Sequence, residues 1–204
     1  MNTKIFLAAI ILLLSIQSQG QRLPPDSTAS RAIASLRKSI NPANFKLFGL
    51  SSVEEAARLR LGSSPIEVYM IRLDSLKNFQ DGDGRTTLIS NNQVVYPLYS
   101  GDNLVSSVKL DFDGKSWSVE SFGDRTLITN YQRALANTPQ SGKKYIIRIP
   151  ALNVYFSAVE NNGIQVTLLG DEQMGDLKPG TTTTLQDALL KLKPLANAYN
   201  GLPW

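Results

Sequence analysis

The sequence predicts an α+β domain in which amphipathic helices pack on a mainly antiparallel sheet. Several consecutive segments alternate apolar and polar residues and are separated by short turns, which is typical of antiparallel strands with one solvated face. Segments before and after them carry apolar residues at helical spacing. Because strands and helices are segregated along the chain rather than strictly alternating, the α+β class is favoured.

Two helices are expected before the sheet. Apolar residues recur at helical spacing over residues 27–40, and the Asn-Pro pair at 41–42 ends the run. The segment at 52–55, S-V-E-E, matches a capping box, in which the Ser oxygen and the Glu side chain satisfy free backbone N–H groups. A second helix is therefore expected there, ending at Gly62, and a strand follows at 66–72.

A four-strand antiparallel meander at about 85–121 is the clearest part of the prediction. Asn and Gly adopt the positive φ angles that tight hairpin turns require, and such residues separate the strands. The four strands are expected at 85–90, 93–99, 104–112 and 115–121. Pro97 cannot donate to a strand ladder, so it indicates an edge strand or a bulge, and an edge there would be open to a partner's strand.

The C-terminal part continues the same pattern. A helix is expected at 127–135 and strands at 145–149, 153–160 and 164–169. A second capping box, beginning at Thr184, starts a last helix that Pro194 should end or kink. Residues 21–204 are expected to form a single domain, in which a smaller C-terminal subdomain at 143–204 is an alternative.

The first twenty residues have the composition of a cleaved signal peptide. Lys4 gives a positive start, an apolar run follows at 5–14, and the small residues Ser18 and Gly20 lie where a signal peptidase requires them. The run is about half of the ~20 residues that span a bilayer, so export without stable membrane insertion is expected, with Gln21 as the first mature residue. The cleavage region resembles signals of Gram-negative bacteria, which indicates the periplasm, the outer envelope or the exterior.

The composition excludes several kinds of chemistry. The chain has no Cys and no His, so it has no thiol nucleophile, no Ser-His-Asp triad and no imidazole or thiolate ligand for a metal. Its basic residues are scattered and its net charge is only +4, which does not indicate binding to nucleic acid. Neither a G-x-S-x-G nor a phosphate-binding loop motif is present, and no cofactor is expected.

Asp81 and Asp83 are the candidate metal ligands. They lie one residue apart in the Gly-containing segment 81–84, where two carboxylates can face one Ca²⁺. An EF-hand loop would need an oxygen ligand, Gly and Glu at its fifth, sixth and twelfth positions, and this chain has Arg85, Thr86 and Asn92 there. The competing interpretation is a solvated turn.

Other residues are candidates for catalysis. Carboxylate pairs act as acid and base in glycan hydrolysis, and five acidic residues are available near the meander: Glu67, Asp111, Asp113, Glu120 and Asp124. Ser35 and Lys38 match the S-x-x-K motif of penicillin-recognising enzymes, but the partner motifs S-D-N and K-T-G are absent. Nothing in the sequence distinguishes these residues from ordinary surface residues, which is the favoured interpretation.

Tyr96, Tyr99 and Trp117 are the candidate binding residues. Exposed rings can stack on sugars or peptide groups, whereas buried rings are simply part of a core. We therefore expect an exported, non-catalytic protein that recognises a protein, a peptide or a glycan. The alternatives are a carboxylate-based glycan hydrolase and a Ca²⁺-stabilised protein.

The order of elements from residue 52 to the segment K-S-W-S-V at 115–119 loosely resembles small exported domains with cystatin-like or NTF2-like architecture. The resemblance implies helices packed on a curved antiparallel sheet, and it implies no functional residue.

Overall fold

The computed structural model describes residues 24–136, 138 and 141–201. The signal peptide expected at 1–20 and the last residues up to Trp204 lie outside this part of the chain. Within it, four α-helices and several 3-10 helices accompany one open sheet of nine strands. The predicted α+β class with a mainly antiparallel sheet is confirmed.

The elements follow one another along the chain in this order: α2 (Pro25–Ser39), η1 (Phe45–Phe48), η2 (Glu54–Arg58), β1 (Leu59–Leu61), β2 (Ile66–Met70), α3 (Leu73–Asn78), η3 (Arg85–Thr87), β3 (Ile89–Ser100), β4 (Asn103–Phe112), β5 (Trp117–Phe122), α4 (Arg125–Ala136), β6 (Lys143–Ile149), η4 (Pro150–Leu152), β7 (Val154–Glu160), β8 (Ile164–Leu169), β9 (Thr182–Thr184) and α5 (Leu185–Ala198).

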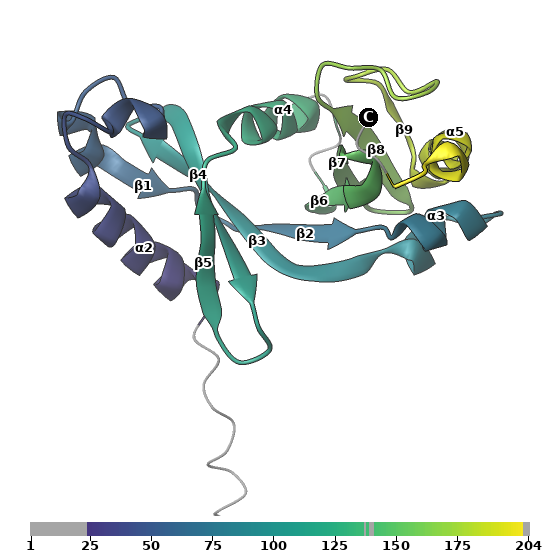
Figure 1. The fold of residues 1–204 in the computed structure, drawn as a ribbon, viewed down its shortest axis with the longest axis horizontal. Coiled ribbons are helices and arrows are strands. Elements are labelled where there is room, and N and C mark those ends of the chain that lie inside the picture. The colour runs from purple at the N-terminus through teal and green to yellow at the C-terminus, as the bar shows by residue number, and fades with distance from the viewer. Residues whose placement is uncertain (1–23, 137, 139–140, 202–204) are drawn as a thin grey trace, which may run out of the picture.

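The strands are ordered β5-β4-β3-β2-β6-β7-β8-β9 across the sheet, and β1 pairs with the far end of β3 (Figure 1). Every pairing is antiparallel except that of β2 with β6, which is parallel. This single parallel pair joins an N-terminal half of the sheet to a C-terminal half.

The helices cover the two faces of the sheet unequally. Glu67 of β2 is paired with Val94 on one side and with Tyr145 on the other, and residues paired in this way point to the same face. Val94 belongs to the core under α2, and Tyr145 belongs to the core under α3 and α5. These three helices therefore share one face, and α4 packs against the centre of the opposite face.

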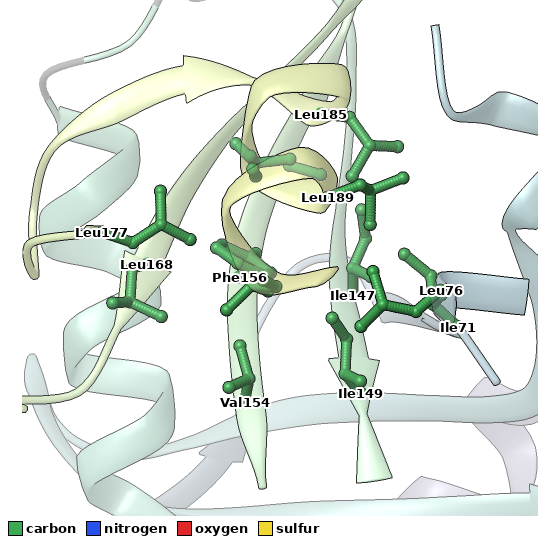
Figure 2. Packing of buried hydrophobic residues seen from close by; sticks show 14 of the residues in the cluster. Ile71, Leu76, Ile147, Ile149, Val154, Phe156, Leu168, Leu177, Leu185 and Leu189 are labelled. Carbon is green, nitrogen blue, oxygen red and sulfur yellow. The ribbon is translucent and has the colours of Figure 1, made fainter. Parts of the chain in front are cut away.

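The C-terminal half has the largest core, which lies between α5, α3 and strands β6–β8. Figure 2 shows Leu185 and Leu189 of α5 packed near Ile147 of β6, with Leu76 of α3 beside them. All four side chains are fully buried. Burial of such aliphatic side chains contributes about 1.5–3 kcal/mol each, which holds α5 on the sheet.

Two predictions about the meander need correction. Residues 85–87 form the 3-10 helix η3, and β3 runs without a turn through Asn91 and Asn92. Asn92 does adopt a positive φ of 51°, but it does so near a register shift between β2 and β3 rather than in a hairpin. The meander therefore has three strands, β3–β5. Neither a four-strand meander nor a cystatin-like or NTF2-like architecture is confirmed.

The predicted capping box at 52–55 starts no α-helix. Glu55 accepts a hydrogen bond from the backbone N–H of Ser51 at 2.8 Å, but only the short η2 follows. The next residues form β1, whose Leu61 pairs with Leu98 of β3. Pairing with β3 thus replaces the continuation of the helix.

The last helix follows its predicted start but not its predicted end. The N–H of Asp187 donates to Thr184 Oγ1 at 3.1 Å, which is the expected N-cap. The helix continues through Pro194 to Ala198. Pro194 and Leu190, whose carbonyl loses its usual N–H donor, are both exposed, so water can take the place of that donor.

No helix in the described part of the chain combines the length and the apolar character that a membrane span requires. The C-terminal region at 143–204 shares its sheet with the rest of the chain, and its division into a subdomain stays a prediction.

Gly84 provides a test of how closely α5 packs. Its φ is +77°, and an added Cβ would lie 2.9 Å from Leu185 Cγ and 3.0 Å from Leu189 Cδ1. Gly101 has a similar φ of +61°, with no atom within 4 Å of an added Cβ. Both Gly→Ala variants incur the strain of positive φ, but Gly84→Ala also overpacks the core. We expect Gly84→Ala to lower the free energy of unfolding by about 1–3 kcal/mol more than Gly101→Ala in urea denaturation. Equal losses would contradict this packing.

Candidate functional site

An open groove lies between α2 and β5. It has a volume of about 620 Å³. We call it the α2–β5 groove, and its lining combines an apolar floor with a polar rim from α2: Thr28, Arg31, Ala32, Ser35, Leu36, Ser39, Phe48, Val119 and Phe122.

The groove follows from the position of β5 at the end of the sheet. In the described residues β5 pairs with β4 and with no other strand. A bulge at Glu120 opposes Lys109 and Leu110, and the extra residue keeps Phe122 on the same face as Val119. Helix α2 contacts β5 as well as β1 and β4, and Val119 and Phe122 of β5 form the outer wall of the groove.

The backbone of β5 is also open to a partner. The N–H of Gly123 donates to the carbonyl of Ser107 at 3.0 Å, so Phe122 and Val108 form a non-hydrogen-bonded pair. The N–H and C=O groups of Phe122 therefore point away from β4. The side chain of Val119 on the same strand is 39% exposed.

The rim of the groove carries one basic side chain, that of Arg31. Lys38 lies two turns further along α2. Neither side chain forms an ion pair with any described residue. An approaching acidic group would therefore meet a cation that has no competing partner.

A second, smaller groove surrounds Trp117 at the start of β5. Its volume is about 370 Å³. The ring of Trp117 is half-buried and packs on Phe112, with ring centroids 5.1 Å apart. We call it the Trp117 groove, and its lining is Pro25, Pro65, Glu67, Val68, Ser90, Asn92, Gln93, Val94, Phe112 and Trp117.

Glu67 connects this groove to an ionic cluster across the parallel pair β2–β6. Its Oε2 lies 2.7 Å from Lys143 Nζ and accepts a hydrogen bond from Tyr69 at 2.8 Å. The hydrogen bond from Lys143 is the main factor that holds the pKa of Glu67 below its ordinary value, and Glu67 in turn raises the pKa of Lys143. Both groups are thus held in their charged forms.

The structure separates the three predicted binding residues. Tyr96 is only 1% exposed, and its hydroxyl bonds to Asp26, so its ring is inaccessible to a ligand. Tyr99 is half-buried, with Arg60 stacked 4.8 Å from its ring centroid and Gln132 bonded to its hydroxyl. Of the three residues, Trp117 alone lines a groove described above.

Asp81 and Asp83 have the contacts of turn residues. Asp81 Oδ1 accepts hydrogen bonds from the N–H of Gly82 and from Gln186, each at 2.7 Å. Asp83 accepts from the N–H of Arg85 at 2.9 Å. Among the described residues, no group of three or more Asp or Glu side chains is placed to hold a metal ion. A role in calcium binding stays a prediction for these two residues.

The remaining acidic candidates lie on β4, on β5 and in the segments that follow these strands. Glu120 pairs with Lys109 at 3.1 Å, and Asp113 accepts the N–H groups of Lys115 and Ser116 in its own hairpin. Asp124 is exposed, and Asp111 is half-buried on β4. Of the S-x-x-K pair, Ser35 lines the α2–β5 groove and Lys38 is exposed.

Sequence analysis missed Arg31 and Val119. The available signal was the spacing of Thr28, Arg31 and Ser35, which places these residues along one edge of the buried stripe of α2. For Val119 the signal was its alternation with Trp117, but a sequence does not show which strand lies at the edge of a sheet.

No family model matches the chain, and neither a curated protein nor a solved structure matches it.

The Glu67–Lys143 pair predicts a specific dependence of stability on pH. Since the pKa of Glu67 is lowered below 4.5 in the folded state, its contribution is present above that pH and is lost as the pH falls through the folded pKa. The raised pKa of Lys143 preserves the pair until the pH exceeds 10.5. We expect Glu67→Gln to cost less than about 1 kcal/mol near pH 7, because both side chains are 48% exposed, and to cost progressively less as the pH falls through the folded pKa of Glu67.

Urea unfolding of the wild-type and Glu67→Gln proteins between pH 3 and pH 8 measures this difference. Asp171→Asn is the matched control, since Asp171 has no ion-pair partner in the described part of the chain. A Glu67→Gln effect of the same size at all pH values would show that the ion pair is not its cause.

Proposed function

We propose that this protein is an exported, non-catalytic binding protein that holds an extended segment of a partner protein in the α2–β5 groove. The segment adds to the sheet as a strand beside β5. The observation that carries this proposal is the combination of an unpaired edge strand with an apolar groove along one side of it.

Strand addition divides recognition between backbone and side chains. Main-chain hydrogen bonds to the edge supply affinity without sequence preference, and pockets for alternate side chains supply specificity. Here Phe122 offers outward N–H and C=O groups, while its side chain, with that of Val119, forms one wall of the groove. A segment with apolar residues at every second position fits both requirements.

The charge of the rim indicates a further property of the segment. Arg31 has no acidic partner among the described residues, so a carboxylate placed beside it would gain a charge-assisted hydrogen bond. We therefore propose a segment that carries an Asp, a Glu or a free C-terminal carboxylate next to its apolar residues.

The arrangement of carboxylates supports binding over glycan hydrolysis. A general acid in such a hydrolase needs a carboxyl group with a raised pKa. Lys143 lowers the pKa of Glu67, which favours the ionised form of that carboxyl group.

Selection from a random peptide library displayed on phage tests the proposed function. We expect enrichment of peptides with apolar residues at alternate positions and one acidic residue. Val119→Lys should lower the affinity for a selected peptide by at least about tenfold, because it places a charge in the apolar wall of the groove. Arg31→Glu should lower the affinity for acidic peptides. Added salt weakens the binding of these peptides to the wild type, and it should no longer do so in Arg31→Glu.

Leu190→Lys is the matched control for Val119→Lys, because Leu190 is equally apolar and 41% exposed on α5, far from the groove in sequence. It should bind the selected peptides like the wild type, and both variants should melt near the wild-type temperature. Selection of the same peptides by the Val119→Lys protein would refute the proposed site.

Export makes a separate prediction. When the full chain is produced in a Gram-negative bacterium, the protein recovered outside the cytoplasm should have the intact mass of a chain beginning at Gln21. Gly20→Tyr should block cleavage, because signal peptidase requires a small residue there, whereas Gln19→Tyr should be cleaved normally. Retention of the uncleaved wild-type chain in the cytoplasm would contradict the proposal.

A further inference from the structure

The Trp117 groove is a separate site from the α2–β5 groove. The two share no lining residue, and they meet different parts of β5. Its volume of about 370 Å³ is at the lower end of the ~300–1,000 Å³ that small-molecule sites occupy. A compact ligand is therefore the better fit here.

The groove presents an aromatic surface to such a ligand. Trp117 is half-buried, and Phe112 supports its ring at 5.1 Å, so the indole is held in place while part of it remains accessible. The face of an indole carries negative charge, which attracts the weakly positive C–H bonds on the flat side of a sugar ring. A partly exposed, supported indole is therefore suited to stacking with a saccharide.

Polar groups with unused hydrogen-bonding capacity lie beside the indole. Both polar contacts of Glu67 use Oε2, and its Oε1 accepts no hydrogen bond from any described residue. Asn92 uses Oδ1 in a 3.5 Å contact with Ser90, and its Nδ2 donates to no described group. The groove thus provides one hydrogen-bond acceptor and one amide donor. Neighbouring hydroxyl groups of a sugar can donate to the first and accept from the second.

We propose that the Trp117 groove binds a neutral saccharide, whose ring stacks on Trp117 and whose hydroxyl groups bond to Glu67 Oε1 and Asn92 Nδ2. Neutral sugars are favoured because Glu67 would repel an acidic sugar. The cation nearest to Glu67, Lys143, is already bound to Glu67 and Tyr69. The proposal does not depend on peptide binding in the other groove.

Tryptophan fluorescence tests this site directly. The chain has two Trp residues, so a Trp204→Phe variant leaves Trp117 as the only indole. Titration of this variant with glucose, cellobiose and N,N′-diacetylchitobiose should give a saturable emission change for at least one sugar, with a millimolar Kd. In the same background, Glu67→Gln and Asn92→Ala should each lower the affinity for that sugar by about fivefold, which is the effect of one lost hydrogen bond.

Two matched controls separate binding from stability. Asp102→Asn removes a paired carboxylate outside the groove, and Asn153→Ala removes an exposed amide at a positive φ of 50°, close to that of Asn92. Both should bind sugar like the background variant. Asn92→Ala keeps the Glu67–Lys143 pair, so a loss of affinity in it does not arise from breaking that pair. No emission change with all three sugars, or equal affinity in Glu67→Gln and Asn92→Ala, would overturn the proposal.

Discussion

The parallel pairing of β2 with β6 is the constraint on which the rest of this structure depends. Four residue pairs, from Glu67 with Tyr145 to Met70 with Arg148, join the two halves of the sheet. Their register places α2 and α5 on the same face, and it leaves α4 to cover the centre of the other. A shift of one residue would turn the side chains of β6 to the opposite face and separate its apolar residues from α5.

Both candidate sites follow from this arrangement. The helices of the shared face cover the two ends of the sheet, so the middle strand β2 keeps Glu67 half-exposed between them, beside Trp117. At the outer end, α2 packs on β1, β4 and β5, and the groove opens between α2 and the side chains of Val119 and Phe122. The sites thus lie where the helical layer is incomplete, and the packed cores hold their walls in place.

Local chemistry was predictable from the sequence, whereas strand neighbours were not. The Asp113-Gly114 hairpin and the Thr184 cap depend on contacts within a few residues, and both are present. Pro97 was expected at an edge strand or a bulge; β3 is an inner strand, and its register with β4 shifts between Leu98 and Tyr99. The missing N–H of Pro97 is tolerated because the neighbour of β3 changes there from β2 to β1. Burial separates Tyr96 on the inner strand β3 from Trp117 on the edge strand β5, and the sequence does not show which of the two strands lies at the edge.

The bulge at Glu120 protects the edge strand β5 against fibre formation. An exposed, regular edge strand is a template on which copies of the same chain can stack. The strand at the other end of the sheet, β9, is only three residues long, so β5 is the edge more open to self-association. The extra residue at Glu120 increases the twist of β5 and interrupts its regular hydrogen-bonding pattern. The Glu120 carboxylate also opposes a water-free contact between two copies of β5. The bulge thus favours pairing of β5 with a complementary partner segment over pairing with another copy of the chain. This matters because the chain has no disulfide to keep it folded.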